Sequence, residues 1–172
     1  DMHIYQGNQP YFAYPRVMGH ELSAEVVTAP KGSDLKAGDA VYIVPYLHCG
    51  HCVACRAGRT NCCTSLKVLG VHIDGGMCEY IALPASALFK AEGISLDEAA
   101  MVEFLAIGAH AVARAGIAPG QRALVVGTGP IGLGVAIFAQ LAGAEVTVLD
   151  GRPERLAFCT DVLKVAHAVT LG

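Results

Sequence analysis

An uncharged run of 22 residues, 123–144, limits the possible folds of this chain more than any other feature. Its length passes the first test for a membrane-spanning helix. The run nevertheless contains Pro130 and five glycines, and its first half has the pattern of a short strand followed by a turn. Its ends also lack the aromatic belts that flank membrane spans. We therefore interpret it as a strand, a turn and a helix in the interior of a folded domain.

The turn in this run has the pattern Gly-x-Gly-x-x-Gly, between a predicted strand at 123–126 and a predicted helix at 131–142. In a dinucleotide-binding turn the first glycine permits the tight bend, the second lets the backbone approach a pyrophosphate, and the third lets the helix pack on the sheet. Asp150 ends the next predicted strand, where an acidic side chain binds ribose hydroxyls and repels a 2'-phosphate. The predicted cofactor is therefore NAD, with binding residues Gly127, Thr128, Gly129, Pro130, Ile131, Gly132, Asp150, Arg152 and Arg155.

NADP stays an alternative, because an arginine just beyond the acidic position can bind a phosphate, and Arg152 and Arg155 lie there. The segment continues with predicted strands at 146–149 and 168–171 and a predicted helix from Pro153 to about residue 165. Strands alternating with helices in this order indicate a parallel sheet.

Residues 1–90 have a different texture, with short apolar runs separated by Gly, Pro and Asp. Runs at 24–28, 40–45 and 77–83 predict short strands of a small barrel or sandwich. The following stretch to residue 114 is rich in alanine and begins with a capping box at Ser95, so it predicts a helical connection. We therefore expect an α/β chain with a β-rich first domain at 1–114 and a second domain at 115–172.

Four cysteines in a short segment predict a structural zinc site in a lobe at about 46–66. Their spacing, Cys49-x2-Cys52-x2-Cys55-x7-Cys63, places four thiolates on tight turns, and four thiolates form a closed tetrahedral site. A ferredoxin-type iron–sulfur run needs a third gap of three residues followed by Cys-Pro, whereas here the gap is seven. A buried apolar cysteine cluster is a further alternative. Other candidate ligands are Cys62, His48 and His51.

The composition favours metal binding in a reducing compartment, and we expect a cytoplasmic protein. The seven cysteines do not suit a disulfide scaffold in a chain this long and apolar, and we expect Cys62, Cys78 and Cys159 to be free thiols. A net charge of −3 with only 12 Lys and Arg argues against a nucleic-acid surface.

Two further features are ambiguous when read from local spacing alone. His20 lies beside Glu21, and such a pair is more often a satisfied surface or core pair than a metal site. Glu103 lies in an otherwise apolar helical stretch, where a carboxylate either reaches solvent or points into a functional cleft. His110, two helical turns further on, is interpreted as a core or interface histidine.

Taken together, these motifs closely resemble the zinc-containing medium-chain alcohol dehydrogenases, and most of all the branch of sorbitol, threonine and sugar-acid (galactonate-type) dehydrogenases. The resemblance rests on Gly19-His20-Glu21, the four-cysteine lobe, Asp74-Gly75-Gly76 leading into Cys78-Glu79-Tyr80, and the dinucleotide motif, in the family's order. It implies a GroES-like β-barrel catalytic domain followed by part of a Rossmann doubly wound sheet. It also implies a homo-oligomer, a dimer or tetramer.

The resemblance further implies reversible oxidation of a secondary alcohol of a polyol, sugar or sugar acid, with hydride transfer to NAD at a catalytic zinc. His20 and Glu103 match zinc ligands, and Glu21 matches a carboxylate that can enter the zinc shell. Asp1 matches the residue that orients the ligand histidine, and His3 matches the one that passes the alcohol proton to solvent.

The third zinc ligand of relatives, a cysteine, would precede Asp1, and relatives are about twice as long. We therefore expect an internal fragment that is inactive by itself. Phe104 stands where relatives have Pro, which alters one wall of the expected substrate pocket; Tyr11 and Phe12 are further candidates to line it. The alternatives are an NADP-dependent member of the family and a non-catalytic zinc- and nucleotide-binding module.

Overall fold

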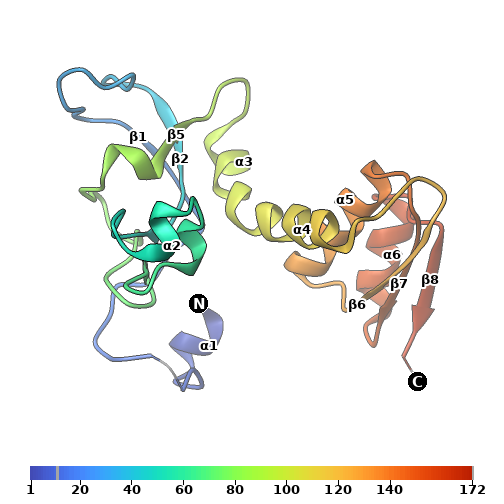
Figure 1. Cartoon of the computed structure of the whole chain (residues 1–172). Helices are drawn as coiled ribbons and strands as arrows, with labels where there is room; N and C mark the ends of the chain where they lie inside the picture. Colours follow the sequence, from blue (N-terminus) through green and yellow to red (C-terminus); the bar gives the residue numbers. More distant parts are fainter. Residues whose placement is uncertain (11, 172) are drawn as a thin grey trace. The chain divides into compact units, whose positions relative to one another are not determined.

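The computed structural model describes residues 1–10 and 12–171 (Figure 1). It divides into two compact units, Asp1–Glu103 and Phe104–Gly172. The division falls near the start of helix α4 (Val102–Ala115), earlier than the expected boundary after residue 114, so that most of α4 belongs to the second unit. Over residues 1–10 and 12–171, none of the helices has both the length and the apolar character needed to cross a membrane.

The first unit is built on a small antiparallel sheet in the order β1 (Leu22–Glu25), β2 (Ala40–Ile43) and β5 (Leu88–Lys90). Side chains alternate along the central strand β2, which buries Val41 and Ile43 while its other residues are half-buried. These short strands confirm the β-rich character expected for this part of the chain.

A second pair of strands closes the base of the cysteine lobe. Strand β3 (Tyr46–Leu47) pairs antiparallel with β4 (Lys67–Val68), so the intervening segment leaves and returns at one place. Within the lobe lie helix α2 (Val53–Arg56) and the 3-10 turn η1 (Thr60–Cys62). The remaining short helices of the unit are α1 (Met2–Tyr5), η2 (Ala85–Ala87) and α3 (Leu96–Ala100).

The strand expected at 77–83 does not form. This segment instead flanks a groove of about 660 Å³ whose opposite wall is β1 and the residues that follow it. Because the groove separates the segment from β1, the ladder of hydrogen bonds that defines a strand is not made there. The short apolar run was therefore a wrong indicator of a strand, because it could not supply a partner.

The helical connection begins as predicted. The side chain of Ser95 accepts a hydrogen bond from the backbone N–H of Glu98, and the Glu98 carboxylate accepts one from the backbone N–H of Ser95 at 2.7 Å. This is the capping box read from the sequence. A break at Met101 separates α3 from α4, so the connection is two helices rather than one.

The second unit contains the parallel sheet predicted from the strand and helix order. Strands β6 (Arg122–Val126), β7 (Glu145–Asp150) and β8 (His167–Thr170) lie side by side, joined by α5 (Pro130–Leu141) and α6 (Pro153–Asp161) (Figure 1). Helix α6 ends four residues before the expected position, because the chain must turn to bury Val165 in the core.

The core of this unit consists of small apolar side chains. Ala136 and Ala139 of α5, Val148 of β7 and Cys159 of α6 are fully buried. Close packing also joins α4 to α5, since a Cβ added at Gly108 would lie 2.6 Å from the backbone of Gly134. The apolar run at 123–144 therefore supplies part of the core of this unit, through Val125, Ala136 and Ala139, while Leu124, Val126 and Leu141 are exposed.

Candidate metal and nucleotide sites

The four cysteines of the lobe converge on one point. Their sulfur atoms all lie within 4.8 Å of one another, and Cys49 Sγ lies 4.0 Å from Cys55 Sγ. Zinc–sulfur bonds of about 2.3 Å in a tetrahedron place the sulfurs about 3.8 Å apart. The donor set and its spacing therefore fit a closed, structural zinc site.

Backbone N–H groups support these thiols as thiolates. Cys52 donates to Cys49 Sγ at 3.4 Å, Cys55 donates to Cys52 Sγ at 3.5 Å, and Cys63 Sγ accepts from Cys49 and Ser65, both at 3.4 Å. The N–H groups of Cys55 and Thr64 lower the pKa of Cys52 to about 5. Burial and the neighbouring sulfur of Cys52 raise the pKa of Cys55 to about 12. Without a cation, the cluster therefore resists losing all of its protons.

The structure also separates the four cysteines from their nearest competitors. Cys62 is exposed on η1, whereas its neighbour Cys63 is buried in the cluster. His48 Nδ1 lies 4.0 Å from Cys55 Sγ, and His51 Nδ1 lies 2.9 Å from the carbonyl oxygen of Cys49. Neither histidine belongs to the group of ligand atoms that all lie within 4.8 Å of one another, which the four cysteines form by themselves.

A second cluster brings together His20, Glu21 and Glu103, whose candidate ligand atoms lie within 4.8 Å of one another. An imidazole with two carboxylates is a donor set that zinc accepts while leaving a position open. Of the three residues, His20 and Glu103 are half-buried and Glu21 is exposed. The cluster brings together residues that are distant in the sequence. His20 and Glu21 follow a loop, whereas Glu103 lies on α4, 82 positions after Glu21.

His20 is held by a tight junction of glycines. Gly19 has a φ of 103°, in the region that favours glycine, and a Cβ at Gly75 would lie 2.2 Å from the Gly19 carbonyl oxygen. Gly70 also approaches closely, with its added Cβ 2.8 Å from Gly19 N. Three backbone segments therefore fix the direction in which the side chain of His20 projects from the backbone. The sequence motif named Gly19 but gave no sign of its partner Gly70.

The two other residues implied by the resemblance lie at the start of the chain. Asp1 Oδ1 lies 3.7 Å from His20 Nδ1, a nitrogen that is buried and has no hydrogen-bond partner within residues 1–10 and 12–171. His3 is exposed on α1. Asp1 and His20 are therefore neighbours without a hydrogen bond between them, while Tyr11 lies outside the described residues and Phe12 packs against Tyr14.

Sequence reasoning missed Tyr46. Its hydroxyl donates a short hydrogen bond to Glu103 Oε1, across 57 residues of sequence. Partial burial of the ring, and then the hydrogen bond to Glu103, raise the pKa of Tyr46 above its ordinary value. In the local sequence, only its position beside the cysteine lobe distinguishes Tyr46, and that position does not predict a contact with α4.

The glycine-rich turn has the geometry that its pattern requires. Gly127 has a φ of 89°, and a Cβ at Gly132 would lie 1.8 Å from the Gly127 carbonyl oxygen. Gly129 caps α5 and Pro130 occupies its first turn, so unpaired N–H groups of the helix point toward the turn. Such a helix N-terminus binds phosphates. A pocket of about 220 Å³ adjoins the turn, between Pro130 and Phe158.

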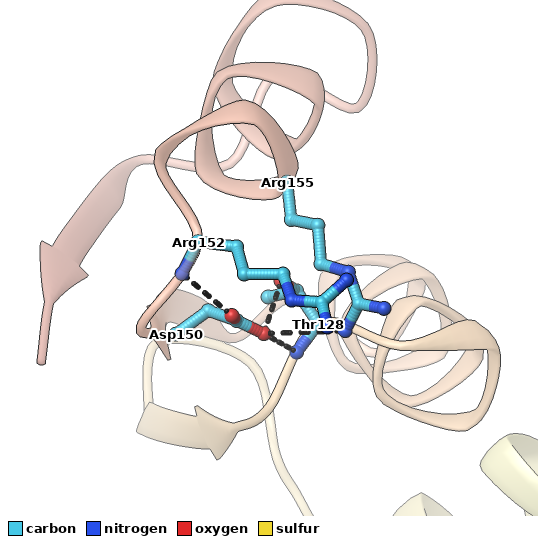
Figure 2. A network of polar contacts seen from close by, with 4 residues as sticks. All are labelled: Thr128, Asp150, Arg152 and Arg155. Carbon is cyan, nitrogen blue, oxygen red and sulfur yellow. Dashed lines mark hydrogen bonds and ion pairs between the residues drawn. The ribbon is translucent and has the colours of Figure 1, made fainter.

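Asp150 is tied to this turn by a network of polar contacts (Figure 2). Its Oδ2 accepts hydrogen bonds from the N–H of Thr128 at 2.7 Å and the hydroxyl of Thr128 at 2.8 Å, and its Oδ1 accepts from the N–H of Arg152 at 2.9 Å. The guanidinium of Arg155 lies 3.9 Å from Oδ2. Chiefly because of Thr128, the pKa of Asp150 falls to about 2, so the carboxylate is ionised at neutral pH.

Comparison with known proteins adds to this geometry. The model of the alcohol dehydrogenase GroES-like domain matches residues 1–93. The L-galactonate-5-dehydrogenase of Escherichia coli K12 is 52% identical over 156 residues, which are 90% of this chain and 46% of that protein. The chain spans about half the length of the curated relatives it matches.

Comparison with solved structures also finds dehydrogenases. An alcohol dehydrogenase from Escherichia coli CFT073, complexed with the cofactor NADH, superimposes with a TM-score of 0.88 at 34% identity and covers 98% of this chain and 50% of its own. A protein assigned as a zinc-binding dehydrogenase from Sinorhizobium meliloti 1021, bound to NADP, gives a TM-score of 0.86 at 31% identity, over 98% of this chain and 49% of its own. This chain therefore belongs to the zinc-containing medium-chain alcohol dehydrogenase family.

Proposed function

We propose that the protein containing this chain oxidises a secondary alcohol of a polyol, sugar or sugar acid and transfers the hydride to NAD. The observation that carries the proposal is the convergence of His20, Glu21 and Glu103 on one point with Asp1 beside the imidazole. A zinc ion bound there would act as a Lewis acid that lowers the pKa of the substrate hydroxyl.

The other roles in the proposed reaction belong to residues of this chain. Asp1 orients the ring of His20, because its carboxylate lies on the side of Nδ1. Glu103 supplies a carboxylate that Tyr46 already holds by a hydrogen bond. Glu21, which is exposed, is the member of the cluster that can enter or leave the metal shell. His3, exposed on α1, passes the proton of the alcohol to solvent.

NAD is the proposed cofactor. The turn at 127–132 and the N-terminus of α5 hold the pyrophosphate, and the ionised Asp150 binds the ribose hydroxyls and repels a 2'-phosphate. Arg152 and Arg155 favour NADP as the second candidate, but Arg155 is already drawn toward Asp150. The relative with NADH and the relative with NADP show that this fold accommodates either cofactor.

We also propose a homo-oligomer in the cytoplasm. All seven cysteines are free, and the four of the lobe must stay reduced to bind metal, which suits a reducing compartment. The partner is then a small molecule, in keeping with the sugar-acid and polyol names of the relatives.

The test is His20→Ala in the full-length protein, assayed for NAD reduction against polyols, aldonates and threonine, with NADP in parallel. Loss of an essential zinc ligand should lower kcat/KM by at least about 1,000-fold. The matched control is His110→Ala, because His110 is an exposed histidine of α4 outside the cluster. Full activity in His20→Ala, or no activity of the wild-type protein on any alcohol, would favour a non-catalytic zinc- and nucleotide-binding module.

A further inference from the structure

Glu103 is a candidate ligand that a side chain from a separate strand holds by a hydrogen bond. Tyr46 lies on β3 at the base of the cysteine lobe, and its hydroxyl donates to Oε1 of Glu103 at the start of α4. A tyrosine hydroxyl has one proton to donate, and that proton is used here. An ionised carboxylate has two oxygens with about four acceptor positions, so the contact leaves most of Glu103 free for a cation.

The contact restricts Glu103 before any metal arrives. A glutamate side chain loses rotational freedom when it is fixed, and this loss opposes metal binding. A glutamate that is already fixed loses less rotational freedom when it binds metal, so the metal affinity of the site is higher. The residues that hold metal ligands in this way commonly change metal affinity by about 10- to 100-fold when they are removed.

We propose that Tyr46 is a positioning residue for Glu103, holding the carboxylate in the orientation in which it meets His20 and Glu21. The inference rests on the proposed function, because it takes these three residues to form a metal site. Its chemistry is nonetheless separate, since Tyr46 touches Glu103 and is not itself one of the clustered ligands.

The backbone around Tyr46 extends the inference to the cysteine lobe. Tyr46 is paired with Val68 across the β3–β4 ladder, and only two residues separate it from Cys49. The ladder joins the two ends of the lobe, so a metal on the four cysteines stabilises the strand that carries Tyr46. The structural site therefore supports the second site through the Tyr46–Glu103 hydrogen bond.

The experiment is metal binding by the full-length Tyr46→Phe protein, which loses the hydroxyl and keeps the ring. Zinc affinity is measured by competition with a graded series of chelators, and the second site is followed by the visible absorption of bound Co²⁺. We expect the weaker class of site to lose about 10- to 100-fold in zinc affinity, with a changed Co²⁺ spectrum, while the thiolate class is unchanged. The matched control is Tyr42→Phe, on the neighbouring strand β2, where the ring stacks on Phe89.

The outcomes separate the two proposals. If the wild-type protein binds two classes of metal and Tyr46→Phe matches it in affinity and spectrum, the role of Tyr46 is refuted and the proposed function stands. If the wild-type protein binds metal only at the four cysteines, both proposals fail. If Tyr42→Phe weakens the second site as much as Tyr46→Phe, the effect is general destabilisation and the inference is wrong.

Discussion

Removing metal from the cysteine lobe should unfold the lobe while the rest of the chain stays folded. Between residues 46 and 66 the only buried residue is Cys63, and neither α2 nor η1 buries any side chain. The lobe therefore has almost no apolar core of its own, and small structures of this kind depend on disulfides or metals. All seven cysteines of the chain are free, so metal binding is the remaining source of stability.

The magnitude follows from mass action. With free zinc buffered at about 1,000 times its dissociation constant, occupancy adds about 4 kcal/mol to the free energy of opening, which is a factor of about 1,000. Proteolysis of an opened segment follows its equilibrium population when opening and closing are fast. Trypsin cleavage in the lobe should therefore become up to about 1,000-fold faster on chelation.

The assay uses two arginines that lie inside the lobe. Arg56 ends α2 and Arg59 precedes η1, so trypsin reaches either peptide bond in an extended form only after local unfolding. Cleavage is followed by mass spectrometry with buffered zinc and with a chelator. Cys63→Ser should be cleaved rapidly even in zinc, because it removes one of the four thiolates.

The control is the adjacent exposed thiol. Cys62→Ser changes the same chemical group one residue away, outside the cluster, and should be cleaved like the wild type. Cleavage rates at Arg56 and Arg59 that differ by less than about twofold between zinc and chelator would refute the reasoning, since the lobe would then be stable without metal.

Three other results are expected in the second unit. Gly132→Ala should lower Tm and abolish the NAD binding that calorimetry measures, because its Cβ would lie 1.8 Å from a carbonyl oxygen. Gly129→Ala is the control and should fold normally, because its Cβ meets only Arg155 at 3.8 Å. Equal losses of Tm in the two variants would contradict this reasoning. Because the pKa of Asp150 is lowered to about 2, its contribution to the free energy of unfolding is present above about pH 4 and lost as the pH falls toward 2. Denaturant titrations should show a weaker dependence over this range in Asp150→Asn than in the wild type. Asp150→Ala in the full-length protein should raise the ratio of kcat/KM for NADP over NAD by at least about 10-fold, and an unchanged ratio would remove Asp150 from cofactor selection.

The features predicted correctly from the sequence are those whose determinants lie close together in the chain. The capping box at Ser95 needs only two residues three positions apart, and the dinucleotide unit needs only a strand, a turn and a helix in succession. The four cysteines converge because tight turns connect neighbouring ligands. In each case local geometry decides the result, so spacing alone was sufficient.

The features that were missed depend on contacts between distant segments. Tyr46 and Glu103 are 57 residues apart, and Gly70 approaches Gly19 across 51 residues, so no local pattern pairs them. The segment at 77–83 has the composition of a strand, but a strand exists only with a partner, and a groove lies where the partner would be. A single sequence contains no signal for such a gap.

The two units differ in what stabilises the residues of their sites, and this difference has a functional consequence. The nucleotide turn rests on an apolar core in which Ala136, Val148 and Cys159 are fully buried, so it is formed before any ligand binds. The candidate catalytic cluster rests on a glycine junction and on Tyr46, which stands at the base of a lobe with almost no core. Metal loss from the four cysteines should therefore weaken the second metal site while leaving the free energy of nucleotide binding unchanged.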